Sequence, residues 1–178
     1  MRRRLVLAAA LSIACRPAAR GPEGAPLPPP AASATLTDST GARVGVATFS
    51  VVDSGVRLGV SVSGLTPGPH GIHIHEQGAC TGPDFGSAGG HLNPAGRQHG
   101  LENPAGPHAG DLPNLLVDAD GSADTIFAVS PDLLAGGEGL FHVGGTAVVV
   151  HAERDDQHTD PSGGSGARVA CGVVERGT

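Results

Sequence analysis

Apolar and polar residues alternate with a period of two along several short stretches of the chain. In the clearest run, Val56, Leu58, Val60 and Val62 are separated by arginine, glycine and serine. This period is typical of β-strands that bury one face and expose the other. The pattern predicts strands at residues 43–48, 56–62, 70–76, 115–118, 122–129, 146–152 and 168–174.

Turn residues separate several of these stretches. Residues 53–55 (DSG) and 118–121 (DADG) are typical of tight turns between antiparallel strands. In the first strand, Val44, Val46 and Thr48 are expected to share one face. No internal repeat and no long helical pattern is visible. We therefore expect an all-β fold, a sandwich or flattened barrel of seven or eight antiparallel strands.

Composition supports a core of aliphatic side chains. The 178 residues include 29 Gly and 15 Pro, but only four Phe and neither Trp nor Tyr, which argues against a helical bundle. The length allows one domain with a sizeable core. Residues 77–113 show no periodicity, and so long a loop normally counts against a compact domain. A metal ion and a disulfide would supply the missing restraint.

The charge balance restricts the partners of the chain. The formal net charge is −6, and none of the cations is a lysine. If Arg2–Arg4 are removed with an export signal, 8 arginines remain against 17 acidic residues, a net charge of −9. Such a surface excludes nucleic acid as a partner. An anionic substrate would need a local positive charge to reach the surface.

The N-terminal residues have the pattern of an export signal. Residues 1–15 combine three arginines, an apolar run too short to span a bilayer, and Cys15. Residues 11–15 (LSIAC) resemble a bacterial lipobox, in which the cysteine is acylated; the alternative is an ordinary signal peptide cut elsewhere. We expect a proline-rich tether at 16–34, a folded domain at 35–178, and a location in the cell envelope with membrane contact only through the lipid anchor.

The cysteine count fits this interpretation. Cys15, Cys80 and Cys171 make an odd number, and lipidation of the first leaves one pair. In an exported protein such a pair is expected to form a disulfide.

Histidines are concentrated in the irregular segment. His91, His99 and His108 occur with Asp111 within 21 residues, among Gly, Pro and Asn residues. Three imidazoles and one carboxylate make a closed four-ligand set that suits zinc. This composition is typical of a loop wrapped around a metal ion.

A second set of histidines lies on predicted strands. His73 and His75 are two residues apart, so both side chains point to one face, with Cα atoms roughly 6.5–7 Å apart. His151 follows three valines at the end of another strand. Histidines without thiolates suit a metal such as Cu²⁺. The pattern predicts two metal sites, with His91 placed to join them.

These motifs together resemble those of the bacterial, exported Cu,Zn superoxide dismutases. The resemblance extends from about residue 35 to residue 174 and is carried by residues 71–76 (GIHIHE), 90–94 (GHLNP), 107–111 (PHAGD), 150–156 (VHAERDD) and 163–172 (GGSGARVACG). It implies a Greek-key β-sandwich of about eight antiparallel strands with long metal-binding loops.

The resemblance also implies a role for individual residues. Copper would be bound by His73, His75, His91 and His151. Zinc would be bound by His91, His99, His108 and Asp111. Asp155 would connect a copper histidine to a zinc histidine by hydrogen bonds, and Arg168 would attract and position the anion. Cys80 and Cys171 match the disulfide of the family.

Three further histidines are not expected to bind metal. His70 matches a family position whose histidine has a structural role and forms hydrogen bonds. His142 and His158 match no ligand position and are expected on the surface or in loops. Arg154 is the only other cation expected near Arg168, since the segment between Asp155 and Arg168 contains no lysine or arginine.

The implied activity is dismutation of superoxide to O₂ and H₂O₂ through a redox-active copper, with His91 and Arg168 as catalytic residues and zinc in a structural part. The alternative is a non-catalytic protein that binds and buffers copper on the same fold. An exported adhesion or structural domain would leave the seven ligands unexplained. Either a monomer or a homodimer is compatible with the resemblance.

Overall fold

The alternating stretches form antiparallel strands. A computed structural model describes residues 30–52, 55–130, 133, 137 and 139–177. In this part of the chain the elements are β1 (Ala32–Asp38), β2 (Arg43–Val52), β3 (Gly55–Val62), β4 (Gly68–His70), β5 (Ile72–His75), the 3₁₀ turn η1 (Gly86–Ala88), β6 (Leu115–Val117), β7 (Ala123–Val129), β8 (Ala147–His151), β9 (Arg168–Val173) and β10 (Glu175–Arg176). The all-β prediction is confirmed.

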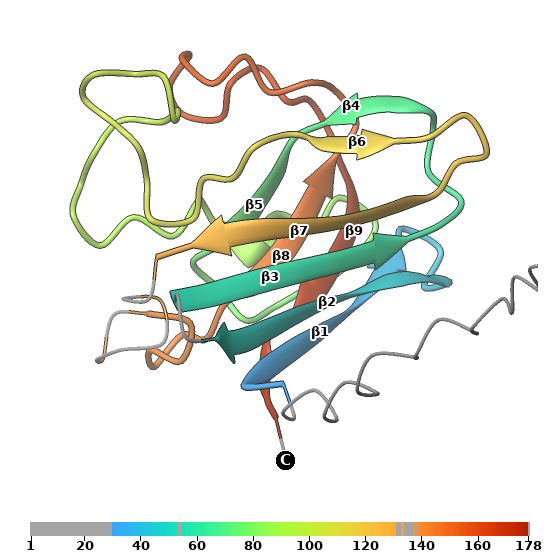
Figure 1. Cartoon of the computed structure of the whole chain (residues 1–178), viewed down its shortest axis with the longest axis horizontal. Coiled ribbons are helices and arrows are strands. Elements are labelled where there is room, and N and C mark those ends of the chain that lie inside the picture. The colour runs from blue at the N-terminus through green and yellow to red at the C-terminus, as the bar shows by residue number, and fades with distance from the viewer. Residues whose placement is uncertain (1–29, 53–54, 131–132, 134–136, 138, 178) are drawn as a thin grey trace, which may run out of the picture.

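One curled sheet contains most of the strands. Its order is β5-β8-β9-β1-β2-β3-β7, with β10 pairing β1, and β4 and β6 form a separate pair. Figure 1 shows β7, β3, β2 and β1 as a front layer, with β5, β8 and β9 behind them and β4 and β6 along the upper rim. The long segments between β5 and β6 and between β8 and β9 leave from the left and upper ends of this half-barrel.

The β2–β3 hairpin is confirmed, but one prediction about its faces is wrong. Val44 is buried, and beyond it Ala47 and Phe49 are buried, whereas Val46 and Thr48 are only half-buried. The cause is an irregularity in the ladder: Leu36 pairs with Gly45, but Thr37 pairs with Arg43. Val44 is the extra residue of a β-bulge, and an inserted residue reverses the faces of all residues that follow.

The first strand of the structure is not among the predicted strands. Ala32 and Ala34 belong to β1 and are buried, although the tether was expected to continue to residue 34. Alanine has too little apolar surface to give a clear alternating signal, so the strand was hidden in the alanine-rich segment. The expected signal peptide, Cys15 and the tether up to residue 29 lie outside the described residues. No helix in the described part is long and apolar enough to cross a membrane.

Apolar side chains form two clusters on opposite sides of β5 and β8. The main core contains Ile72 and Ile74 of β5 together with Val148 and Val150 of β8. The second cluster lies on the other face and consists of Phe85, Ala88, Ala147, Val149 and Cys171, with Cys80 packed against it. Because both faces are covered, every residue of β5 and β8 is buried.

Candidate metal centre

Strand β5 fixes the direction of the first two histidines. Ile72 and Ile74 face the main core, so His73 and His75 face the opposite side of the sheet. Both histidines are almost completely buried. The predicted alternation therefore places the isoleucines of β5 in the main core and its histidines on the opposite face, where the candidate metal site lies.

The loop of residues 76–114, which we call the zinc loop, returns along β5. His75 forms an isolated β-bridge with His91, and His73 forms one with Asp111. The N–H of Ile74 donates to the Gly110 carbonyl at 2.9 Å. A Cβ on Gly110 would collide with the Ile74 carbonyl oxygen, so only glycine permits this close approach. His91 and Asp111, which lie 16 and 38 positions after their bridge partners in the sequence, are thus brought beside the strand histidines.

The first ligand set consists of four buried histidines whose ring nitrogens converge. Its ligand atoms lie within 4.8 Å of one another, and its members are His73, His75, His91 and His151. The Nε2 atoms of His75 and His151 are 3.4 Å apart. His75 Nδ1 donates to the Gly89 carbonyl and His151 Nδ1 to the Gly166 carbonyl. The two Nε2 lone pairs therefore face each other, an arrangement that a shared cation satisfies.

The second ligand set surrounds one carboxylate. Its members are His91, His99, His108 and Asp111, also within 4.8 Å of one another and buried. Asp111 Oδ1 lies 2.9, 3.0 and 3.2 Å from the Nδ1 atoms of His91, His99 and His108. Asp111 Oδ2 accepts hydrogen bonds from the backbone N–H groups of Gly100 and His108. Three imidazoles and one carboxylate in this arrangement fit zinc.

Two buried nitrogens test whether copper fits the first ligand set, which we call the copper set; the second is called the zinc set. His73 Nδ1 and His91 Nε2 have no hydrogen-bond partner within the described part of the chain. Buried polar atoms without a partner are costly and rare in folded proteins. His91 directs its other nitrogen, Nδ1, toward the zinc set, so its ring lies between the two sets. Metal ligation accounts for both atoms, and the donor set fits copper.

Asp155 connects the two sets by hydrogen bonds. Its Oδ2 accepts from His73 Nε2 at 2.7 Å, and its Oδ1 accepts from His99 Nε2 at 3.0 Å. A carboxylate can only accept, so both Nε2 atoms carry the protons and both Nδ1 atoms are left for metal ligation.

Burial favours the neutral imidazoles that metal ligation requires. Mainly through burial, the pKa of His73 is lowered to about 3, that of His75 to about 2 and that of His151 to about 4. For His99 burial acts in the same direction, but Asp111 and Asp155 outweigh it and raise the pKa to about 9. Although burial opposes it, hydrogen bonds from histidines hold the pKa of both carboxyl groups well below the usual range. Both aspartates are therefore available as anions.

Arg168 lies at the rim of the copper set. It lines a cleft of about 520 Å³ together with His75, His91 and His151. Its guanidinium donates from Nη1 to the Phe85 carbonyl and from Nη2 to the Gly89 carbonyl, each at 2.6 Å. The Gly89 carbonyl also accepts from His75 Nδ1, so one backbone oxygen positions both the cation and a copper-set ring.

A second arginine lines this cleft, and it is not the one that the sequence indicated. Arg154 is exposed and does not line the cleft. Arg97 does line it, and its guanidinium donates to the Gly106 carbonyl at 2.9 Å. Arg97 was missed because it lies 71 positions before Arg168 in the sequence, within a loop that has no periodicity.

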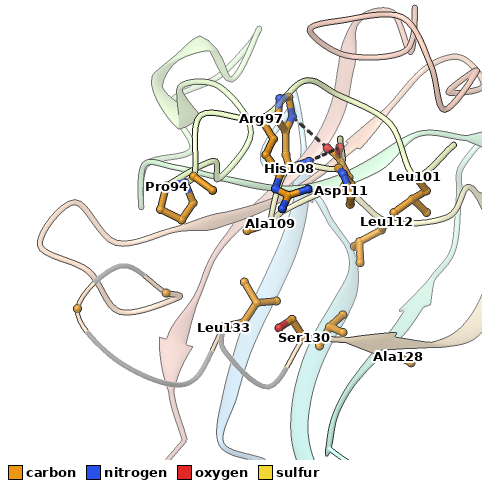
Figure 2. A pocket seen from close by; sticks show the side chains of 15 residues that line it. Pro94, Arg97, Leu101, His108, Ala109, Asp111, Leu112, Ala128, Ser130 and Leu133 are labelled. Atoms are coloured by element: carbon orange, nitrogen blue, oxygen red, sulfur yellow. Dashed lines mark hydrogen bonds and ion pairs between the residues drawn. The ribbon is translucent and has the colours of Figure 1, made fainter. Parts of the chain in front are cut away.

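A larger pocket of about 730 Å³ is also lined by residues of the zinc loop, and it shares Arg97 and His108 with the cleft. Figure 2 shows Arg97, His108 and Asp111 along one wall, with Leu133, Ser130 and Ala128 on the opposite wall. It contains no member of the copper set and no Arg168. The smaller cleft, and not this pocket, is therefore the candidate reaction site.

The remaining predictions concern the disulfide and the other histidines. Cys80 and Cys171, which are 91 positions apart in the sequence, form a disulfide. His70 is buried, and its ring nitrogens lie 2.6 and 2.8 Å from the carbonyls of His151 and Thr66, which fits the predicted structural part. His142 and His158 belong to neither ligand set.

Comparison with known proteins places this geometry in a family. Residues 43–174 match the family model described as Copper/zinc superoxide dismutase (SODC). The chain belongs to the copper/zinc superoxide dismutase family. It is 44% identical over 147 residues to Superoxide dismutase [Cu-Zn] 2 of Aquifex aeolicus, covering 80% of this chain and 85% of the relative. It is also 44% identical over 149 residues to Superoxide dismutase [Cu-Zn] of Caulobacter vibrioides, covering 81% and 85%.

Solved structures agree with this family. A mutant of a SOD-like protein from Bacillus subtilis has a TM-score of 0.74 and 44% identity, over 79% of this chain and 95% of that one. The Cu/Zn superoxide dismutase from Brucella abortus has a TM-score of 0.66 and 33% identity, over 80% and 98%. The two converging ligand sets are thus placed on the fold of copper/zinc superoxide dismutases.

Proposed function

We propose that this member of the family dismutates superoxide at the cleft lined by Arg168 and the copper set. Copper would be held by His73, His75, His91 and His151, and zinc by His91, His99, His108 and Asp111. The observation that carries the assignment is His91: its buried ring presents Nδ1 to the zinc set, and to the copper set an Nε2 that has no hydrogen-bond partner among the described residues.

Each part of the site has a separate task in this proposal. Copper, when bound, supplies the alternating one-electron reduction and oxidation by which one superoxide becomes O₂ and a second, with two protons, becomes H₂O₂. The Arg168 guanidinium attracts the anion into the cleft and orients it, because its two carbonyl contacts fix its direction. His91 Nε2 faces the copper set and is placed to hold and release a proton. Asp155 keeps the His73 and His99 rings in the orientation that ligation requires.

Replacement of His91 by alanine tests the bridging role. We expect the variant to lose most of its dismutation activity and to hold both metals less tightly, because one ring serves both sets. Superoxide decay and metal content after dialysis are the measurements. The matched control is His158→Ala, which removes an exposed imidazole that contacts Glu102 at 3.0 Å and belongs to neither set. Unchanged turnover in His91→Ala would exclude the bridging role.

A non-catalytic copper buffer is the other function considered from the sequence. Such a protein needs neither a complete copper set nor a cation at its rim. Here four histidines converge, and Arg168 shares their cleft. These observations support the enzyme, and no described residue favours the buffer.

We also propose that the protein is held in the cell envelope by a lipid on Cys15, with residues 1–15 as signal peptide and the following segment as tether. The Cys80–Cys171 disulfide supports an oxidising compartment. Cys15→Ser should move the protein from the membrane fraction to the soluble fraction on cell fractionation. Continued membrane association of the variant would exclude this anchor.

For assembly, we propose a monomer or a homodimer. Light scattering coupled to size-exclusion chromatography of the purified protein distinguishes the two, and a larger assembly would contradict the proposal.

A further inference from the structure

The backbone of Asp155 is held by a single asparagine from a distant part of the chain. Asn114 Oδ1 accepts a hydrogen bond from the Asp155 N–H at 2.8 Å, and Asn114 Nδ2 donates to the Asp155 carbonyl, also at 2.8 Å. Both polar groups of one side chain thus bind both polar groups of one backbone residue. Such a pair fixes the position and the rotation of Asp155 relative to the zinc loop.

Asn114 lies where the zinc loop ends. It follows the zinc ligand Asp111 by three positions and immediately precedes β6. Gln157 adds a second connection, since its Nε2 donates to the Leu112 carbonyl at 3.2 Å. The turn that carries Asp155 is therefore fastened to residues 112–114, and a displacement of that segment displaces Asp155.

The Asp155 carboxylate has little freedom of its own. Oδ2 accepts from His73, while Oδ1 accepts from His99 and from the Gln157 N–H at 2.6 Å. Its side chain is completely buried. Because both oxygens are already committed, the carboxylate bridges the two rings only while its backbone stays in place.

From this geometry we propose that Asn114 is a positioning residue that couples the zinc site to the copper site. The path runs from the end of the zinc loop through Asn114 to Asp155, and from Asp155 to His73. Bound zinc would fix the end of the loop through Asp111, Asn114 would pass that position on to Asp155, and Asp155 would hold His73 with Nδ1 free for copper. The inference rests on the proposed assignment of the two ligand sets.

The first test replaces Asn114 with alanine in the full chain. Loss of groups that orient metal ligands typically weakens metal binding about 10- to 100-fold. We expect a zinc affinity at least about tenfold lower, measured by competition with a chelator, and a changed d–d spectrum of Co²⁺ in the zinc site. The electron paramagnetic resonance spectrum of bound Cu²⁺ should change as well, because His73 loses its fixed orientation. Unaltered affinity and spectra would overturn the proposal.

Asn93→Ala is the matched control. Asn93 makes the same kind of reciprocal pair, but with the backbone of Arg97 inside the zinc loop, at 2.8 and 2.9 Å. Asn93 lines the cleft but does not pair with Asp155, so its loss should change the Cu²⁺ spectrum less than Asn114→Ala does. A Cu²⁺ change as large as that of Asn114→Ala would show general loosening of the loop and would contradict the specific path.

A double-mutant cycle separates positioning from general stability. If Asn114 acts through Asp155, adding Asn114→Ala to the Asp155→Ala variant should lower zinc affinity by less than about twofold further. A change of that size is within the usual error of such cycles. Independent effects that multiply would overturn the proposal.

Asn114→Asp provides a variant that keeps the acceptor for the Asp155 N–H and loses the donor to the carbonyl. An intermediate loss of affinity is expected, and no loss would contradict the clamp.

These outcomes are distinguishable from failure of the proposed function. If the unaltered protein binds neither metal or does not remove superoxide, the function fails. If it does both and the Asn114 variants behave like the unaltered protein, only the inference fails.

Discussion

At the scale of single residues, the site depends on which atom of each side chain is held and which is left available. Arg168 illustrates this: its two terminal nitrogens are held by carbonyls of residues 85 and 89, so the guanidinium cannot swing away. Burial lowers its pKa from the ordinary value, but an arginine remains charged at any physiological pH. On a chain with excess negative charge, such a fixed cation gives the cleft a local attraction for anions.

Arg168→Gln should lower the rate of superoxide removal and weaken its dependence on ionic strength. Electrostatic steering, for which superoxide dismutases are themselves a standard example, accounts for about tenfold or more in association rate. Dismutation rates across a salt series are the measurement. Arg154→Gln is the matched control, since it removes the same charge from an exposed position outside the cleft. Equal effects of the two substitutions would show that only net charge matters.

At the scale of elements, the loop between β8 and β9 packs against the contact between the Asp155 carboxylate and His99. Gly163 lies in this loop with φ of 62°, and a Cβ there would collide with Asp155 Oδ1 and would lie 2.9 Å from His99 Nε2. Gly164 has nearly the same backbone conformation, with φ of 64°, but a Cβ there meets nothing within 4 Å. Comparing substitutions at these two glycines distinguishes the effect of backbone strain from that of a steric clash with Asp155.

Gly163→Ala should weaken zinc binding about tenfold or more, because the new methyl group displaces the Asp155 carboxylate from His99. Gly164→Ala should cost only the left-handed backbone strain of about 1–2 kcal/mol in unfolding free energy and leave zinc affinity unchanged. Chelator competition and urea unfolding of both variants measure the two effects. Equal zinc affinity in the two variants would contradict the steric argument.

The sequence predicted most strands because a period of two is a local signal. It missed β1, where alanines carry the buried face, and it misplaced the faces of β2, where the bulge at Val44 depends on pairing with another strand. The residues of the two ligand sets were predicted to lie together because their motifs are short and characteristic, and the structure places them together. Asn114 and Gly163 were missed because they act on Asp155 from other positions in the loops, and only the folded chain shows those contacts.

At the scale of the whole molecule, burying several histidines makes the metal-free fold sensitive to acid. His73, His75 and His151 have pKa values of about 3, 2 and 4 in the folded chain, below the ordinary 6.5. Below pH 6.5 the unfolded chain therefore takes up protons that the folded chain does not, so stability falls as pH falls. His99, whose pKa is about 9, acts in the opposite sense, but its stabilisation is fully present below 6.5 and is lost only as pH rises through 9.

We therefore expect the metal-free protein to lose unfolding free energy between pH 6.5 and about pH 4.5. Each lowered histidine contributes up to about 1.4 kcal/mol per pH unit in this window. Urea unfolding of metal-free protein at several pH values measures the slope. Replacing the exposed His158 with alanine should leave the slope unchanged. A stability that is constant over this range would contradict the burial of these rings in the neutral form.

The most direct test of the central claim is superoxide decay followed by pulse radiolysis, with the full chain loaded with copper and zinc. The account predicts fast decay that requires copper and that falls sharply in His91→Ala. Slow, uncatalysed decay in protein that demonstrably holds both metals would contradict it, and would leave a metal-binding protein that has the fold of a dismutase without its activity.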